Sequence, residues 1–264
     1  MARRIAVAAT APFGADVLER LAAEHDVVQL FTRPDKPRGR GRKLASPPAK
    51  EVAQRLGIPV EQPARLDSSV GIAAHTVVVC AYGLLIPSAL LDRALWLNVH
   101  PSLLPRWRGA APVERALMAG DEETGVTIHR TVGALDAGPV AAVRAFPVAP
   151  EDDAGAVYAR SAEIAAELLG DVLAQDDPRF EPQPEEGATY AEKIGPEDRV
   201  LAPGAPAQEL VNRVRALSPH IGARLGDLIV WRARVSGDGS FEPVEVQPAG
   251  GRRMAYDAYL RGRR

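Results

Sequence analysis

Two polar side chains, Asn98 and His100, close the apolar run Leu95-Trp-Leu-Asn-Val-His-Pro101. Side chains alternate along a strand, so Asn98 and His100 point to the same face, and Pro101 ends the strand directly after them. A histidine near its ordinary pKa can take up or release a proton, and an amide can donate a hydrogen bond without changing charge. These residue types suit proton transfer and hydrogen-bond donation, although a purely structural pair at a strand end has the same pattern.

The segment after this strand, Ser102-Leu-Leu-Pro-Arg-Trp-Arg-Gly-Ala-Ala-Pro112, is bounded by prolines and leads into a helix predicted at Val113–Ala119. It places Trp107 between two arginines. Apolar loops of this length are held either by packing or by a ligand. The residues alone leave both interpretations open.

A run of cations lies between Arg33 and Lys43, separated by glycine and proline. Its members are Arg33, Lys36, Arg38, Arg40, Arg42 and Lys43. Such a run is commonly a solvated, flexible loop. This one leaves the carboxyl end of the strand predicted at Val27–Phe31, where it could instead bind the phosphates of a nucleic acid.

Short apolar runs alternate with helical patterns through the first 150 or so residues, a length typical of one domain. The predicted strands are Ile5–Ala9, Val27–Phe31, Ile58–Val60, Thr76–Ala81 and Leu95–His100, and the predicted helices are Ala15–His25, Pro47–Leu56 and Pro87–Ala94. Continuous apolar strands joined by helices predict an α/β fold, a doubly wound and mostly parallel sheet. In such sheets functional groups gather beyond the carboxyl ends of the strands.

The rest of the chain changes character twice. A long amphipathic helix is predicted at Asp152–Gln175, and a stretch rich in proline and glutamate follows it. We therefore predict a catalytic domain over residues 1–178, a linker over 179–204 and a small second domain over 205–264. That last domain should contain a helix at Ala207–Leu217, strands near Leu228–Val235 and Pro243–Val246, and a short helix near Met254–Leu260.

Composition excludes several classes of protein. The net charge of -2 does not indicate a general nucleic-acid binder, and a single cysteine, Cys80, excludes an internal disulfide or a cysteine metal cluster. No apolar run approaches the roughly 20 residues of a membrane span, and the amino-terminal run is too short for a signal peptide. The first strand lacks Gly-x-Gly-x-x-Gly after it, which argues against a dinucleotide site.

The chain is expected to be cytoplasmic and monomeric. No metal is expected, since the four histidines other than His100 lack ligand spacing and should be structural or exposed: His25, His75, His129 and His220.

Several segments occur in an order that resembles a known enzyme family. They are Ala81-Tyr-Gly-Leu-Leu-Ile-Pro87, Leu97-Asn-Val-His-Pro-Ser-Leu-Leu-Pro-Arg-Trp-Arg-Gly-Ala-Ala-Pro112, Gly120-Asp-Glu-Glu-Thr-Gly-Val-Thr127 and Leu135-Asp-Ala-Gly138. Together they resemble the 10-formyltetrahydrofolate-dependent formyltransferases. The basic run and Thr189-Tyr-Ala-Glu-Lys193 resemble the branch of that family that formylates methionyl-initiator tRNA, and the resemblance runs nearly end to end.

The resemblance implies roles that fit the chemistry of formyl transfer, in which an amine attacks the formyl carbon and tetrahydrofolate leaves. It implies Asn98, His100 and Asp136 as the catalytic residues: the first two donate to the oxyanion or leaving nitrogen, and Asp136 sets the charge of His100 and relays the amine proton through water. The residues implied to bind the folate donor are Tyr82, Gly83, Leu84, Ser102, Leu103, Leu104 and Pro105. The basic run is implied to contact the tRNA.

The carboxyl-terminal region departs from the family pattern. Family members build a small OB-like barrel there, whereas this chain passes from Trp231-Arg-Ala-Arg-Val235 directly into Ser236-Gly-Asp-Gly239, so about two strands should be missing. Two alternatives therefore stay open. The chemistry could act on an amino-sugar nucleotide or another small amine, or the chain could be a non-catalytic tRNA-binding relative.

Overall fold

The computed structural model of the chain describes residues 2–38 and 43–262. In chain order the first half forms β1 (Arg4–Ala9), α1 (Pro12–Glu24), β2 (Asp26–Phe31), β3 (Lys36–Arg38), β4 (Lys43–Ala45), α2 (Pro48–Leu56), β5 (Val60–Glu61), β6 (Thr76–Cys80), α3 (Ser88–Leu91), β7 (Leu95–His100), β8 (Arg108–Gly109), α4 (Pro112–Ala119) and β9 (Glu123–Arg130). The second half forms β10 (Val140–Pro147), α5 (Ala154–Ala174), β11 (Tyr190–Ala191), a 3-10 turn (Glu197–Arg199), α6 (Ala207–Leu217), β12 (Ala223–Leu225), β13 (Leu228–Val235), β14 (Phe241–Pro248), β15 (Met254–Ala255) and α7 (Tyr256–Arg261).

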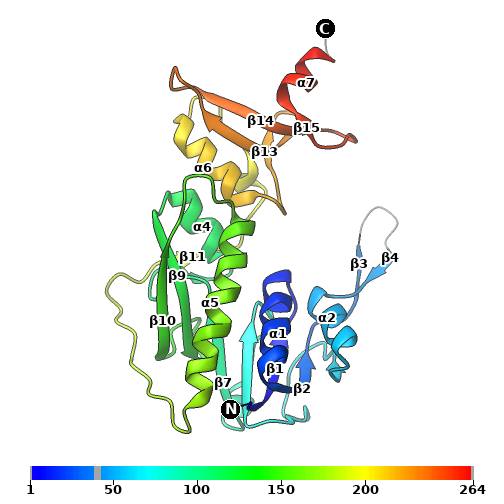
Figure 1. Ribbon diagram of the computed structural model, residues 1–264, viewed down its shortest axis with the longest axis vertical. Helices are drawn as coiled ribbons and strands as arrows, with labels where there is room; N and C mark the ends of the chain where they lie inside the picture. The colour runs from blue at the N-terminus through cyan, green and yellow to red at the C-terminus, as the bar shows by residue number, and fades with distance from the viewer. Residues whose placement is uncertain (1, 39–42, 263–264) are drawn as a thin grey trace. The chain divides into compact units, whose positions relative to one another are not determined.

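The main sheet has seven strands in the order β10-β9-β7-β6-β1-β2-β5 (Figure 1). The strands β7, β6, β1, β2 and β5 run parallel, and β9 joins β7 antiparallel. The order steps outward from β1 in both directions, which confirms the predicted doubly wound, mostly parallel sheet. Its central strands are almost wholly buried, in agreement with their continuous apolar sequences.

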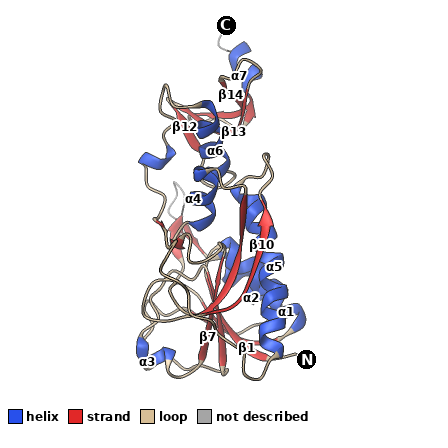
Figure 2. Ribbon diagram, turned by 90° about the vertical axis from the view of Figure 1, so that its left-hand side faces the viewer, coloured by secondary structure: helices blue, strands red, loops and turns tan. Residues whose placement is uncertain are grey.

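Both faces of this sheet are covered. Figure 2 shows α1, α2 and α5 on one side of the strands and α3 with loops on the other. A Cβ at Gly14 would overlap the carbonyl oxygen of Cys80, so α1 packs very closely on the sheet. On the opposite face, Leu66 and Leu90 pack with Trp96 in one buried cluster. The fold thereby fixes the positions of the strand ends that carry the polar residues.

The structure shifts or adds several elements. Strand β9 covers Glu123–Arg130, and α1 begins earlier than predicted, with Pro12 in its first turn. Strand β10 was not predicted. Its residues are mostly exposed or half-buried because it lies at the edge of the sheet, so its sequence lacks the apolar run of a central strand.

The hairpin of β3 and β4 also was not predicted. Its two strands contain Lys36, Arg38 and Lys43 of the basic run, and they pair in the register Lys36 with Ala45 and Arg38 with Lys43. At its base the ammonium group of Lys50 lies 2.8 Å from a carboxylate oxygen of Asp35, which also accepts a hydrogen bond from Gln62 at 2.7 Å. Apolar and polar residues do not alternate in this segment, so a strand pattern could not be recognised.

The described chain divides into two compact units that interleave in sequence. One comprises residues 1–108, 125–144 and 159–188, and the other comprises residues 109–124, 145–158 and 189–264. In the second unit α6 packs on the four-stranded antiparallel sheet β12-β13-β14-β15, with Leu217, Val230 and Val246 in its core. Within the described residues this sheet has an open strand order, as the expected truncation of a small β domain requires. The bounds of the three predicted segments, 1–178, 179–204 and 205–264, stay a prediction.

Candidate active site

The carboxyl ends of β1, β2, β6 and β7 meet at one edge of the main sheet, because these strands are parallel. Thr10, directly after β1, donates its hydroxyl to the carbonyl of Tyr82 after β6 at 2.8 Å. The backbone N–H of Arg33, after β2, points to the same hydroxyl at 3.4 Å. His100 ends β7 at this edge. Four strands thus bring their terminal residues together.

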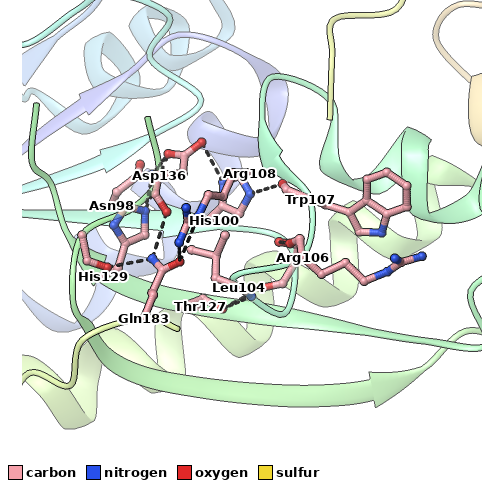
Figure 3. Close-up of polar contacts among 12 residues, drawn as sticks. Asn98, His100, Leu104, Arg106, Trp107, Arg108, Thr127, His129, Asp136 and Gln183 are labelled. Carbon is pink, nitrogen blue, oxygen red and sulfur yellow. Dashed lines mark hydrogen bonds and ion pairs between the residues drawn. The ribbon is translucent and has the colours of Figure 1, made fainter. Parts of the chain in front are cut away.

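Asn98, His100, His129 and Asp136 form a polar cluster at this edge, in which the two histidines are buried and Asn98 and Asp136 are partly buried (Figure 3). The amide nitrogen of Asn98 lies 3.1 Å from Oδ1 of Asp136 and 3.0 Å from Nε2 of His129. Asp136 Oδ2 is 3.7 Å from Nδ1 of His100, and its Oδ1 is 3.7 Å from Nε2 of His129. The structure therefore brings the three predicted catalytic residues together; their roles stay a prediction.

The tautomer of neutral His100 follows from its partner. Its Nε2 lies 2.8 Å from the carbonyl oxygen of Trp107, which can only accept, so Nε2 carries the proton. In the neutral ring Nδ1 is then without a proton and faces the carboxylate of Asp136. Protonation of Nδ1 would create an imidazolium beside that carboxylate while the bond to Trp107 persists. The site can thus store one proton on His100.

The amide of Asn98 is oriented in the same way. Nδ1 of His129 lies 3.1 Å from the carbonyl of Arg130 and must donate to it, which leaves Nε2 of neutral His129 as an acceptor. Both N–H groups of Asn98 are then engaged, one by His129 and one by Asp136. Asn98 can therefore donate to a substrate only if the substrate replaces His129 or Asp136 as the acceptor of one of these two N–H groups.

Burial governs the charge of this cluster. Burial lowers the pKa of His100, while the negative charge of Asp136 and the hydrogen bond to Trp107 raise it, and the net shift is downward. His100 is therefore neutral at pH 7 and above, with Nδ1 available as a base. The side chains of His100 and Asp136 are 5% and 14% exposed, so the interaction between them is stronger than it would be at the surface.

Backbone strain is concentrated around the cluster. The residues other than glycine with positive φ in the described chain are Ala81 (+46°), Trp107 (+62°) and Asp136 (+47°). Ala81 precedes Tyr82, Trp107 supplies the carbonyl that holds His100, and Asp136 is in the cluster itself. Left-handed conformations of such residues are unfavourable by about 1–3 kcal/mol each and persist where the surroundings enforce them, often at functional sites.

The loop after β7 is held by hydrogen bonds within it and by hydrogen bonds to Thr127 of β9. The Ser102 hydroxyl donates to the carbonyl of Arg106 at 2.7 Å, and Thr127 donates to the carbonyl of Ser102 at 2.7 Å. The backbone N–H of Leu104 reaches the Thr127 hydroxyl at 3.2 Å. Ser102 is fully buried, so its side chain serves the loop, whereas Leu103, Leu104 and Pro105 are partly exposed.

The segment after β6 separates a buried tyrosine from an exposed leucine. The Tyr82 ring is 2% exposed and packs in the core, where burial raises the pKa of its hydroxyl to about 12. Gly83 is exposed, Leu84 is half-buried, and Leu85 is 89% exposed. Leu85 was not among the residues that the sequence implied for donor binding. Any contact of Tyr82 with a ligand at the surface would involve its backbone.

The predicted cations are only partly described. Arg33 is half-buried at the strand edge, close to Gly83, and Lys36 is exposed at the start of β3. Arg38 and Lys43 are paired backbone positions of the hairpin. The remaining two cations of the run, Arg40 and Arg42, lie outside the described residues.

Sequence reasoning missed two members of the site. His129 is 1% exposed and lies opposite Asn98 in the pairing of β7 and β9. It is a buried strand residue, and its ring also contacts Asn98 in the cluster. The alternation Thr127-Ile-His129 at the end of an apolar strand could have indicated it, since it matches Asn98-Val-His100. Gln183 gave no such signal, because it lies in a proline-rich segment without periodicity.

Gly138 offers a test of how tightly the Asp136 loop is fitted. A Cβ there would coincide with the carbonyl oxygen of Arg130, so Gly138→Ala must displace backbone. We expect the free energy of unfolding to fall by at least about 2 kcal/mol, measured by urea denaturation. Gly133→Ala is the matched control in the same loop, because nothing lies within 4 Å of its Cβ. Equal stability of the two variants would contradict the close fit.

No helix of the described chain is both long and apolar enough to cross a membrane.

The family model and two relatives that match this chain are all named as formyltransferases. Residues 3–173 match the family model described as formyl transferase. The chain is similar to the methionyl-tRNA formyltransferase of Halorhodospira halophila, with 41% identity over 303 aligned residues that cover 100% of this chain and 97% of the relative. The counterpart from Heliobacterium modesticaldum is 37% identical, with 99% and 97% covered.

Solved structures agree on the fold. A methionyl-tRNA formyltransferase from Clostridium thermocellum superposes with a TM-score of 0.66 at 15% identity, covering 94% of this chain and 99% of that one. An N-formyltransferase from Helicobacter canadensis in complex with folinic acid and dTDP-3-aminofucose gives 0.65 at 16%, covering 89% and 88%. The 303 aligned positions of the Halorhodospira relative exceed the 264 residues of this chain, so that relative carries segments that this chain lacks.

Proposed function

The chain belongs to the methionyl-tRNA formyltransferase family, and from this premise we propose that it transfers a formyl group from 10-formyltetrahydrofolate to the amino group of methionyl-initiator tRNA. The observation that carries the proposal is the contact of Asn98, His100 and Asp136 at the sheet edge, in a chain that aligns with these relatives over nearly its full length. A full-length match favours a shared substrate as well as a shared reaction.

The surroundings of the cluster suit a folate-derived donor. Leu85 is 89% exposed in the loop after β6, and Leu135, next to Asp136, is 61% exposed. Leu103 and Leu104 are partly exposed in the loop after β7. Such apolar side chains beside buried polar groups match a ligand with flat aromatic rings and a polar reacting centre. We propose that they contact the donor together with Gly83, Leu84, Pro105 and the backbone near Tyr82 and Ser102.

Proton transfer can be assigned to His100 and Asp136. The amine must be neutral to attack the formyl carbon, and it loses a proton as the new C–N bond forms. Nδ1 of neutral His100 accepts this proton, either directly or through a water molecule. Such a water could lie between Nδ1 and the Asp136 carboxylate, because their separation of 3.7 Å is longer than a direct hydrogen bond. The adjacent carboxylate stabilises the imidazolium that results. Nδ1–H then returns the proton to the nitrogen of the leaving folate, so His100 ends the cycle neutral.

The developing oxyanion needs hydrogen-bond donors placed in advance. Asn98 supplies one N–H when the substrate oxygen displaces a present partner, and the protonated His100 supplies a second donor. The other N–H of Asn98 stays bound to His129 or Asp136 and keeps the amide plane fixed. His100 is buried and Asn98 is partly buried, and a donor shielded from solvent is more effective than one at the surface.

The direct test is formylation by the purified protein. Methionyl-initiator tRNA and 10-formyltetrahydrofolate are supplied, and N-formylmethionine released from the tRNA is measured by mass spectrometry. We expect formylation that depends on both substrates, and none with uncharged tRNA, which lacks the amine. Absence of N-formylmethionine with a folded preparation would refute the proposal.

The basic hairpin is the proposed contact with tRNA phosphates. Neutralising Arg38, Arg40 and Arg42 to glutamine should lower kcat/KM for the tRNA and reduce the slope of its logarithm against the logarithm of salt concentration by about 1 per lost phosphate contact. Arg65→Gln is a control for loss of a surface charge, since this side chain is 87% exposed and is not part of the basic run. An unchanged salt slope in the triple variant would exclude the hairpin as the tRNA contact.

A further inference from the structure

The segment that follows α5 returns to the main sheet within the first unit. The backbones of Val140, in β10, and Glu181 bond to each other in both directions, at 2.7 and 2.9 Å. This pairing places Gln183, two residues further along, beside the loop that carries Asp136. A part of the chain that sequence analysis treated as a linker therefore reaches the candidate active site.

The side-chain amide of Gln183 is fully used by that loop and by one arginine (Figure 3). Its two N–H groups donate to the carbonyl oxygens of Asp136, at 2.9 Å, and Gly138, at 2.7 Å. Its carbonyl accepts from Nη2 of Arg108 at 3.0 Å and from Nε at 3.2 Å. A glutamine with every donor and acceptor engaged has a single orientation.

Arg108 is itself held in place. Its side chain is 2% exposed, and Nη1 lies 3.3 Å from both carboxylate oxygens of Glu185, whose side chain is 80% exposed. The buried guanidinium is thus paired at its outer end and bonded to Gln183 at its inner end. This arrangement fixes the amide of Gln183 rather than leaving it free to rotate.

The Asp136 loop needs such support. Val132, Gly133, Ala134 and Leu135 are all exposed, and Asp136 adopts a left-handed backbone conformation. Its carboxylate nevertheless lies 3.7 Å from a ring nitrogen of each histidine. A displacement of about 1 Å at a reacting group can lower a rate about 100-fold, so the anchoring of this backbone matters for the rate.

We propose that Gln183, held by Arg108, is a positioning residue that fixes the backbone of Asp136 and thereby keeps its carboxylate against His100 during formyl transfer. The inference rests on the proposed function, since it concerns the rate of that reaction. Gln183 acts through Asp136 and touches neither substrate. Its loss should therefore affect kcat and the titration of His100 rather than the binding of either substrate.

Two variants separate the contributions of the amide. Gln183→Met keeps the length and removes all four hydrogen bonds. Gln183→Glu keeps an acceptor for Arg108 but replaces both donors by a carboxylate that repels the two carbonyl oxygens. Gln175→Glu is the matched control, because Gln175 also donates to a backbone carbonyl, that of Asp171 at 3.1 Å, on an exposed helix end.

We expect both Gln183 variants to lower kcat by about 10- to 100-fold, with KM for both substrates within a factor of two and the control at the wild-type rate. The pKa of His100, followed by NMR, should fall in Gln183→Met, which adds no charge, because the charge of Asp136 that raises it lies further away. A wild-type kcat in Gln183→Glu, or a lower kcat with an unmoved His100 titration in Gln183→Met, would overturn the proposal.

The two failures are distinguishable. If the wild-type protein transferred no formyl group, the proposed function would fail, whereas the NMR titration would still report whether Gln183 places Asp136 beside His100. Urea denaturation of each variant shows that the measured protein is folded. If Gln183→Met does not fold, Gln183→Glu is used for the rate measurement, because it keeps an acceptor for the buried Arg108. If Gln183→Glu does not fold, Gln183→Met is used.

Discussion

Replacing His100 by alanine is expected to lower kcat for formyl transfer by about 100- to 10,000-fold, the usual range for removal of a positioned acid–base group. Nδ1 of His100 is an unprotonated nitrogen that faces Asp136. Nε2 of His129 also faces Asp136, but it accepts a hydrogen bond from Asn98. KM for tRNA should change little, because His100 is buried and lies away from the basic hairpin in sequence. Single-turnover kinetics with saturating substrates measures the effect.

His75→Ala is the control for loss of a histidine. His75 is exposed and directly precedes β6, at the opposite end of the strand from Tyr82. We expect its kcat to equal that of the wild type. A His100→Ala variant that retained the wild-type rate would show that the amine proton leaves by another route, and the assignment of His100 would be wrong.

Replacing Asp136 by asparagine is expected to lower kcat by about 100- to 1,000-fold. Opposite charges about 4 Å apart interact by roughly 4 kcal/mol at an effective dielectric constant near 20, and part of this stabilisation is lost when His100 becomes protonated without a carboxylate beside it. The shape of the side chain is kept, so folding should be little affected. Asp227→Asn, at an exposed turn between β12 and β13, controls for the loss of one carboxylate.

The same variant should change the pH dependence in a defined direction. Activity requires His100 to be neutral before it accepts the amine proton, so the rate falls as pH drops through its pKa. Asp136 raises that pKa against the effect of burial, so its removal should lower the pKa further and move the acidic limb to lower pH. A limb that moved to higher pH would contradict the assigned pairing.

Much of the main sheet follows from local sequence. The strands β1, β2, β6 and β7 were predicted because each is a short, nearly continuous apolar run, which is the pattern of a strand buried on both faces. The position of Asn98 and His100 on one face followed from the alternation of side chains. Their contact with Asp136 came from the family resemblance, because no local pattern connects residues 38 positions apart.

The elements that were missed share a physical cause. Strand β10 and the hairpin of β3 and β4 lie at edges, where one side of the strand is solvated and the apolar pattern is weak. His129 was overlooked because a single histidine in an apolar strand is more often structural. Gln183 was invisible to sequence reasoning, since its effect depends on backbone carbonyls that only the folded loop brings together.

The central claim is that this chain formylates the amine of a charged tRNA. The most direct measurement compares kcat/KM for methionyl-initiator tRNA with that for an amino-sugar nucleotide, using one preparation and 10-formyltetrahydrofolate as the donor. We expect a much higher kcat/KM for the tRNA, and a loss of that preference when Arg38, Arg40 and Arg42 are neutralised. Efficient formylation of the amino-sugar nucleotide with none of the tRNA would contradict the claim, and it would leave the chemistry at His100 and Asp136 in place with a different acceptor.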